Sequence, residues 1–329
     1  MKARLVAAAL SGVLLNVAFP PHDLWWLAPV AVGLLTNTVR GRTFRQGALL
    51  GWVHGLVFFG VLLVWTGTIA GVLAWVALTL LESIFSAALG LALTAVLRVP
   101  AWPLWAAAVW VGEEALRDRL PFGGFPWGRL AFSQGHTPLT ALASWGGAPL
   151  VTFAVAALAA LVVRAPGRAV LVGPVLVLVA LVTPVPTGGQ RVNVGVVQGN
   201  VPRVGLERPD QVSQVLANHV QATHDLAASV RAGTLPAPQL VIWPENASDL
   251  DPYTDAGAAA SIEGAAADVG VPILVGAVPD GPGRFVSNRG IVWDPVSGAG
   301  ASYVKRHPVP FGEYIPFRAL VRKVTDKVD

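Results

Sequence analysis

Glu245 stands at the end of an apolar run in the last third of the 329-residue sequence. The run Leu240–Trp243 predicts a strand, and a proline separates it from the glutamate. A carboxylate just past a strand end lies where open α/β sheets place their sites. An isolated glutamate at such a position is equally typical of a surface loop, so Glu245 alone does not define a site.

Two further segments carry titratable side chains. Tyr303–His307 predicts a strand end that delivers Lys305 next to other cations, and a neighbouring positive charge or desolvation would lower the pKa of this lysine. An exposed basic cluster is the ordinary alternative. The segment Pro310–Pro316 places Glu313 in a turn framed by glycine and proline, with aromatic residues on both sides.

Strands that alternate with helices are expected to position these side chains. The predicted strands are 192–198, 239–243, 272–278, 288–294 and 301–305, and the predicted helices are 209–231 and 255–269. The last two strands pair naturally as a hairpin across Pro295–Gly298. This order predicts an α/β sandwich over residues 190–329, incomplete at its C-terminal end because the number of elements is too low for a closed domain.

The preceding part of the chain has the composition of a membrane protein. Hydrophobic residues make up 54% of the sequence and charged residues 13%, well below the roughly 25% of a soluble domain. Seven apolar runs approach the length of about 20 residues that a helical span needs. They are 4–19, 24–39, 46–67, 70–97, 101–117, 136–163 and 168–184. Residues 1–186 are therefore predicted to form a membrane α-helical bundle of about seven spans.

The first apolar run has a second interpretation as a signal peptide. Phe19-Pro20-Pro21 follows it in place of a small-residue cleavage site, which favours a retained span. Cations in short loops then set the orientation, since these loops keep Lys and Arg on the cytoplasmic side. With seven spans one side collects Lys2, Arg4, Arg40, Arg42, Arg45, Arg98, Arg164 and Arg168. The N-terminus is predicted to be cytoplasmic and residues 190–329 to lie outside.

Few charged residues lie within the predicted spans. Glu82 stands in the middle of an apolar run, which makes it a functional hypothesis by default. Glu113 and Glu114 lie near the outer end of the fifth span, within reach of water or of loop arginines. His54 is predicted to form an interhelical hydrogen bond. The loop Arg117–Arg129 places three arginines outside, which indicates a specific structure, a lipid-headgroup contact, or an exception without meaning.

Several classes of function are disfavoured. The sequence has no cysteine, which excludes disulfides and cysteine-ligated metals within it. His219 and His224 lie five apart on poorly matched faces of a predicted helix, which disfavours a metal hydrolase, and no cofactor is predicted. The cations form no basic face interleaved with aromatic residues, so no nucleic-acid partner is expected. No pair of broken, charge-bearing spans marks a transport path, which disfavours a transporter.

Together these segments resemble the nitrilase superfamily, and specifically its membrane-bound members, the apolipoprotein N-acyltransferases. Val196–Pro202 is similar to the family's first strand and its Gln-Gly-Asn turn, and Trp243–Glu245 matches its glutamate motif. Tyr303–Pro316 is similar, almost residue by residue, to the family's lysine motif. Gly124–Gln134 resembles the loop after the family's fifth span.

The resemblance implies a two-step acyl transfer at the bacterial plasma (inner) membrane. A cysteine thiolate takes an acyl chain from a membrane phospholipid and passes it to the N-terminal diacylglyceryl-cysteine of an apolipoprotein. Glu245 would be the general base, Lys305 would stabilise the oxyanion and Glu313 would be a supporting carboxylate. The three side chains are expected to converge on one cleft that faces the membrane surface.

Two departures from the family pattern stand out. Val204–Glu207 lacks a tryptophan that the family usually carries after its first turn. The family's nucleophilic cysteine and an eighth span follow the Glu-Tyr-Ile-Pro segment by some tens of residues, so the chain is expected to be truncated before its nucleophile and inactive alone. The alternative is a catalytically inactive relative that binds lipid or lipoprotein.

Overall fold

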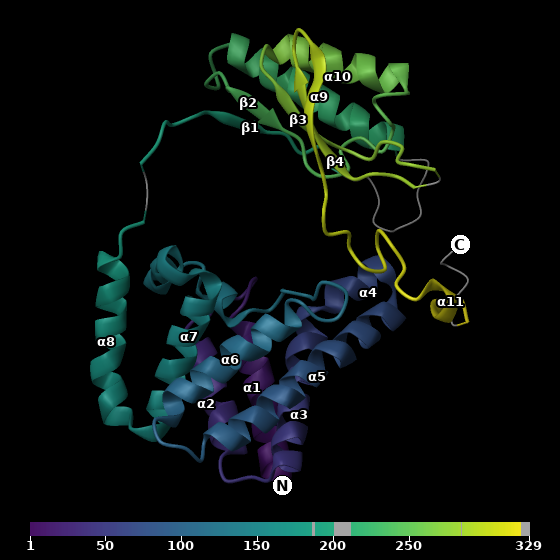
Figure 1. Ribbon diagram of the computed structural model, residues 1–329. Coiled ribbons are helices and arrows are strands. Elements are labelled where there is room, and N and C mark those ends of the chain that lie inside the picture. Colours follow the sequence, from purple (N-terminus) through teal and green to yellow (C-terminus); the bar gives the residue numbers. More distant parts are fainter. Residues whose placement is uncertain (186–187, 201–211, 284, 324–329) are drawn as a thin grey trace. The chain divides into compact units, whose positions relative to one another are not determined.

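The computed structural model describes residues 1–185, 188–200, 212–283 and 285–323 (Figure 1). The chain divides into two compact units, Met1–Thr187 and Gly188–Asp329, which we call the helical unit and the sheet unit. The predicted segments 201–202 and Val204–Glu207 lie outside the described residues, as do residue 186 and residues 324–329.

Helices build the helical unit, and they follow the predicted apolar runs. They are α1 (Lys2–Val17), α2 (Leu27–Val39), α3 (Phe44–Leu62), α4 (Val64–Ala70), α5 (Val72–Val96), α6 (Trp102–Arg117), α7 (Ala143–Arg164) and α8 (Pro166–Val182), with short 3-10 turns η1 (Leu130–Gln134) and η2 (Pro138–Leu142). The third run is divided into α3 and α4, which are bent by 53° relative to each other. Gly71, at φ +93°, separates α4 from α5 in a conformation that favours glycine.

Two stretches of the described chain are long and apolar enough to cross a membrane by themselves. They are α5 and the stretch Pro138–Arg164, and the bent pair α3–α4 makes a third if it counts as one span. The helices α2 and α8 are apolar but shorter. Length and composition therefore give two or three candidate spans, fewer than the seven apolar runs of the sequence.

A row of glycines brings α3 against α5. Gly47, Gly51 and Gly55 are spaced by four residues and so share one face of α3. A Cβ atom at Gly51 would lie 2.1 Å from the carbonyl oxygen of Ser86, and one at Gly90 would lie 2.2 Å from that of Gly47. The two backbones are therefore in direct contact, as in the small-residue packing of membrane helices.

The sheet unit contains one five-stranded mixed sheet. In spatial order its strands are β1 (Val194–Val196), β2 (Leu240–Ile242), β3 (Ile273–Ala277), β4 (Arg289–Asp294) and β5 (Gly298–Val304). The first three are parallel, β4 pairs antiparallel with β3, and β5 pairs antiparallel with β4. Helices α9 (Val212–Arg231) and α10 (Ala256–Val269) connect the parallel strands, and the short α11 (Arg318–Val321) comes last.

In the sheet unit, α9, α10 and the strands fall inside the predicted ranges with one exception, and the short α11 was not predicted. Strand β5 begins at Gly298, three residues before the predicted strand, because Gly298 already pairs with Asp294 across the turn. Residues 209–211 of the predicted helix lie outside the described chain, and α9 begins at Val212.

The core of the sheet unit forms on one face of the sheet. Val241, Ile273 and Trp293 are in register across β2, β3 and β4, and they are buried with residues of α10 such as Ile262. On the opposite face, residues such as Leu274 are only half-buried. The described part of the unit is thus a sheet with helices against one face.

The glycine contact predicts the effect of adding one methyl group. Gly51→Ala should lower the free energy of unfolding of the chain in detergent by about 1–3 kcal/mol, because a backbone atom cannot move aside. The matched control is Gly112→Ala on α6, where a Cβ atom meets nothing within 4 Å. That change should be neutral or stabilising by up to about 1 kcal/mol. Equal thermal unfolding curves for the two variants would contradict the proposed contact.

Candidate active site

The sheet topology brings the ends of distant strands to one edge. Glu245 follows the end of β2, and Lys305 follows the end of β5. Because β4 runs antiparallel to both of its neighbours, the end of β5 lies at the same edge of the sheet as the start of β4 and the end of β3. Glu313 comes back to this edge in the loop after β5. Residues that are 60 apart in the chain are thereby placed together.

The ammonium group of Lys305 lies between two carboxylates. Its Nζ atom is 2.7 Å from Oε1 of Glu245 and 2.9 Å from Oε2 of Glu313. The three residues singled out in the sequence therefore meet in one cluster. We call these residues, together with Asn288, the edge cluster.

Asn288 completes the cluster and was not predicted. Its Nδ2 atom donates to Oε1 of Glu245 at 2.5 Å and to Oε1 of Glu313 at 2.8 Å. The feature that identifies Asn288 is its place in the hairpin. Arg289 pairs with Val304, so Asn288 stands opposite Lys305. The backbone N–H of Lys305 also donates to the carbonyl of Asn288 at 2.9 Å.

Buried packing under the edge fixes the position of Glu245. Trp243, two residues earlier, is buried, and its Nε1 atom donates to Oγ1 of Thr223 on α9 at 3.0 Å. The ring of His219 lies 5.5 Å from that of Trp243. On the other side, a Cβ atom at Gly276 would lie 2.2 Å from the carbonyl oxygen of Pro244. The turn that carries Glu245 is therefore held between α9 and the backbone of β3.

The edge cluster remains open to solvent. The side chain of Glu245 is 54% exposed and that of Lys305 is 28% exposed. Desolvation lowers the pKa of Lys305, but the hydrogen bonds and negative charges of Glu245 and Glu313 outweigh it, and the pKa is raised overall. The lysine thus keeps its charge while its ammonium stays within reach of a bound molecule.

Glu313 is held as a carboxylate by its donors. Desolvation raises its pKa, but hydrogen bonds from the backbone of Val309 and from Lys305 and Asn288 outweigh it, and the pKa is lowered overall. The Val309 N–H lies 2.5 Å from Oε2 of Glu313. Glu313 is thus better suited to hold Lys305 in place than to exchange protons near neutral pH.

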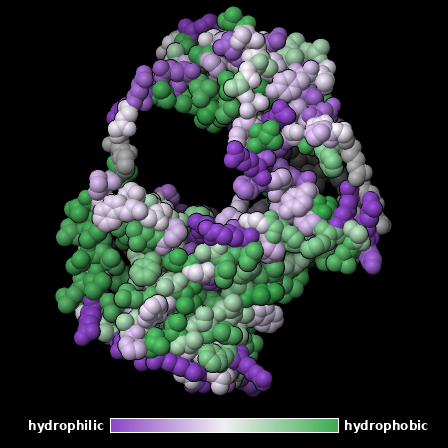
Figure 2. All heavy atoms as spheres, viewed as in Figure 1, coloured by the Kyte–Doolittle hydropathy of each residue, from purple (hydrophilic) through white to green (hydrophobic). Residues whose placement is uncertain are grey.

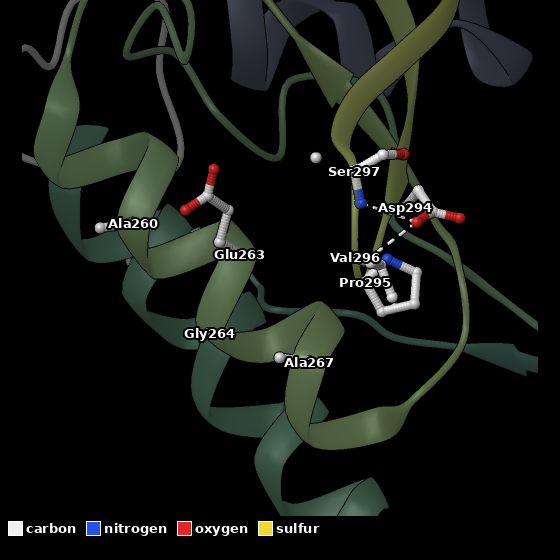
Figure 3. A pocket seen from close by; sticks show the side chains of 9 residues that line it. Ala260, Glu263, Gly264, Ala267, Asp294, Pro295, Val296 and Ser297 are labelled. Carbon is white, nitrogen blue, oxygen red and sulfur yellow. Dashed lines mark hydrogen bonds between the residues drawn. The ribbon is translucent and has the colours of Figure 1, made fainter.

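An open groove on the sheet unit is separate from the edge cluster. Its volume is ≈ 430 Å³, and α10 and the β4–β5 turn line it, with Glu263 on the helix side and Asp294 on the turn side (Figure 3). Asp294 uses its Oδ1 atom to accept from the backbone of Val296 and Ser297, both at 2.9 Å. The turn lies at the other end of the hairpin from Lys305, about 20 Å away at the rise of a strand.

The charged residues of the helical unit form a second, buried group. Nε of Arg117 is 3.1 Å from Oε1 of Glu113, and Nη1 is 3.7 Å from Oε2 of Glu82. Oε1 of Glu114 accepts from the backbone of Leu130 at 2.7 Å. Of the two expected environments for Glu113 and Glu114, water is wrong because both side chains are buried, whereas Glu113 does reach an arginine of the loop, Arg117.

The loop Arg117–Arg129 has a specific structure. Nη1 of Arg117 donates to the carbonyls of Phe125 and Trp127 at 3.0 and 2.7 Å. Arg129 pairs with Asp118. Arg117 and Arg129 thus form contacts within the protein. This favours a specific structure for the loop over a lipid-headgroup contact or an exception without meaning.

His54 and His224 each have a side-chain partner on another helix. Nδ1 of His54 is 2.7 Å from Oγ of Ser11 on α1, so the predicted interhelical hydrogen bond is confirmed. Nδ1 of His224 is 2.6 Å from Oδ2 of Asp268, a contact between α9 and α10. Over the described part of the chain, His, Asp and Glu residues form no group that could hold a metal ion.

Comparison with known proteins identifies the class of protein first. The family model for the apolipoprotein N-acyltransferase N-terminal domain matches residues 11–161, most of the helical unit. The chain is 40% identical to the apolipoprotein N-acyltransferase of Mycolicibacterium smegmatis, over 99% of this chain and 61% of that protein. Its candidate membrane helices and these bacterial relatives indicate an integral bacterial membrane protein.

Two more relatives of the same name establish the family. Identity is 32% with the protein of Azotobacter vinelandii, over 96% of this chain and 65% of the relative. It is 31% with that of Methylococcus capsulatus, over 99% and 67%. The chain belongs to the apolipoprotein N-acyltransferase family. It spans about three fifths to two thirds of the length of these relatives.

The pKa shifts predict how the edge cluster responds to pH. The contribution of Glu313 to stability is present above its unfolded pKa of about 4.3 and is lost as the pH falls through its lower folded pKa. That of Lys305 is present below about 10.4 and is lost as the pH rises through its raised folded pKa. The stability difference between the chain and Glu313→Gln should therefore be constant between about pH 5 and 10.

The measurement is denaturant unfolding at a series of pH values. Below about pH 4 the difference should shrink, because protonated Glu313 no longer attracts Lys305. Glu263→Gln, on the groove side of the unit, serves as the control for removing a carboxylate. A difference between the chain and Glu313→Gln that persists unchanged at pH 3 would show that Glu313 acts only by packing.

Proposed function

We propose that residues 1–329 form part of an acyltransferase that moves a fatty acyl chain from a membrane phospholipid to the N-terminal diacylglyceryl-cysteine of apolipoproteins. The observation that carries the proposal is the edge cluster, in which Lys305 lies between Glu245 and Glu313. Its support is the membership of the chain in a family whose members carry this activity in their names.

In this proposal Glu245 is the general base. It accepts the proton of a thiol, and the thiolate attacks the ester carbonyl of the phospholipid to form a tetrahedral oxyanion. Collapse of this intermediate gives a thioester, and Glu245 returns the proton to the lysophospholipid that leaves. In the second half, Glu245 takes a proton from the attacking α-amino group, the C–S bond of the thioester breaks, and Glu245 gives the proton to the departing thiolate. The exposed side chain of Glu245 suits this exchange.

Lys305 supplies fixed positive charge where the oxyanion develops. Such pre-positioned charge is among the larger contributions to catalysis. Glu313 and Asn288 keep the ammonium at the edge of the sheet, and the raised pKa of Lys305 keeps it charged. Because both substrates are anchored in lipid, we also propose that the edge cluster opens toward the membrane surface.

The thiol is not among residues 1–329, which contain no cysteine. We therefore expect residues 1–329 alone to form no acyl-thioester. The competing function is binding of lipid or lipoprotein without turnover. An acyl-transfer assay distinguishes the two functions.

We also propose a nitrilase-like sandwich and seven membrane passes. The half-buried face of the sheet, with Ile242, Leu274 and Val292, suits a second layer packed against it. The helices α1 to α8 suit seven passes if α3 and α4 form one of them. The positive-inside rule then gives a cytoplasmic N-terminus in the bacterial inner membrane and a sheet unit on its outer face.

The roles of Glu245 and Lys305 can be tested by exchange of segments. Residues 1–329 would replace the matching segment of the Mycolicibacterium smegmatis relative, and acyl transfer from a labelled phospholipid to a diacylglyceryl peptide would be measured. Lys305→Met should lower the rate by about 100-fold or more, because an oxyanion loses its positive charge. Glu245→Gln should lower it by about 100- to 10,000-fold, because the base is lost.

Glu263→Gln is the matched control, since it removes an exposed carboxylate of the same unit. Its rate should stay within about twofold of the unsubstituted chimera, as expected for a surface position outside the cluster. A chimera that transfers acyl chains equally well with Met at position 305 would refute the oxyanion role. A chimera that binds phospholipid but never forms a thioester would favour the non-catalytic relative.

The proposed orientation has its own test. Alkaline phosphatase, which is active only outside the cytoplasm, should be active when fused after Gly189 and inactive when fused after Gly41. The reason is that the cationic loops are retained inside, so the sheet unit is exported. The opposite pattern of activities would reverse the topology, and activity at both positions would contradict a single orientation.

A further inference from the structure

Among the described residues, one end of the helical unit carries Lys and Arg side chains but no Asp or Glu. Nη1 of Arg4 donates to the carbonyl of Thr38 at 2.5 Å, and Nη2 of Arg98 donates to that of Arg42 at 3.0 Å. These contacts bring the start of α1, the α2–α3 connection and the end of α5 to the same end. We call this the basic rim; it consists of Lys2, Arg4, Arg40, Arg42, Arg45, Arg98, Arg164 and Arg168.

Figure 2 shows hydrophilic residues gathered along the edge of the helical unit where α1 begins. Among the described residues of this unit, the acids lie away from the rim. Glu113, Glu114 and Asp118 are at the far end of α6, Glu82 is mid-way along α5, and Asp23 follows the other end of α1. The first turn of α6, at the rim, contains no acidic residue.

Two of these cations lie against the indole ring of Trp102. The guanidinium carbon of Arg40 is 5.9 Å from the centre of the indole ring, and that of Arg164 is 6.0 Å from it. Arg40 caps the end of α2, Trp102 begins α6, and Arg164 ends α7. Three helices that are distant in sequence thus bring two exposed arginines onto one buried ring.

The pair of arginines lacks a compensating charge. In the part of the chain that the structure describes, neither guanidinium forms an ion pair with Asp or Glu. Both guanidinium carbons lie within 6.0 Å of the ring centre, so the two like charges are at most about 12 Å apart and repel each other. A cation–π contact at an exposed site contributes only about 0.5–1 kcal/mol. An anion that accepts hydrogen bonds from both guanidiniums would turn this repulsion into attraction.

The surroundings of the pair are those of a membrane interface. Leu104 and Trp105 on α6 and Val162 on α7 are exposed apolar side chains within three residues of Trp102 or Arg164. A soluble anion would gain nothing from these side chains, whereas the acyl chains of a lipid would cover them. We therefore propose that Arg40 and Arg164 bind the phosphate of an anionic phospholipid such as phosphatidylglycerol.

This lipid site is separate from the edge cluster. It belongs to the helical unit and shares no residue with the edge cluster, and the length of α6 places Trp102 about 22 Å from Arg117. It therefore requires neither the acyltransferase activity nor its nucleophile. A lipid at this position would join α2, α6 and α7 through one headgroup and stabilise their packing.

The test compares two double variants of the full chain, residues 1–329, in detergent. Arg40→Gln with Arg164→Gln removes the pair on Trp102, and Arg45→Gln with Arg168→Gln removes two exposed rim cations that have no contact with that ring. The binding of phosphatidylglycerol is measured by native mass spectrometry, with phosphatidylcholine as the neutral lipid. The first variant should bind phosphatidylglycerol about 10-fold more weakly, and the second should stay within about twofold of the parent.

Each outcome decides the proposal. Equal losses in both double variants would indicate a diffuse electrostatic effect and overturn the site, as would equal binding of phosphatidylcholine. Competition by millimolar inorganic phosphate would assign the pair to a soluble anion instead of a lipid. If the first double variant does not fold, Arg164→Gln alone should weaken binding about threefold, and unchanged binding in that variant would also overturn the site.

Discussion

The ammonium group of Lys305 allows two carboxylates to share one edge of the sheet. Glu245 and Glu313 both lie within 3.0 Å of this cation, and without it their negative charges would repel each other. The neutral amide of Asn288 also donates to both carboxylates, to Oε1 of Glu245 and to Oε1 of Glu313. Loss of the lysine therefore does more than remove one charge, because it leaves the two glutamates facing each other and frees the loop that carries Glu313.

The sequence predicted the three charged members of this cluster but not the fourth. The charged members could be found because strand ends and a distinctive motif mark them. The register beside Lys305 does not follow from the turn at Pro295–Gly298, because a bulge between Ile291 and Trp293 shifts the pairing. Asn288 carries no charge and resembles any polar residue before a strand. Only its place opposite Lys305 reveals it, and that place is a property of the pairing rather than of the residue type.

In the helical unit, hydropathy located the helices but not their contacts. Apolar runs mark where a helix can lie. Hydropathy averaged over a window does not register the spacing of Gly47, Gly51 and Gly55, which brings the backbones of α3 and α5 into contact. The predicted run 136–163 matches the candidate span Pro138–Arg164, but the α-helix within it begins only at Ala143. Residues before Ala143 form short turns instead, and the turn at Leu130 is held by the carboxylate of Glu114, a contact between positions 16 apart.

Two clusters of the chain have similar composition and opposite surroundings. Arg117 pairs with Glu113 and lies near Glu82, and its side chain is only 1% exposed. Lys305 also lies between glutamates, but the side chain of Glu245 is more than half exposed. A buried ion pair is costly to disturb and suits the fixing of a loop. An exposed pair contributes little to stability, which leaves its charges free to act on a substrate.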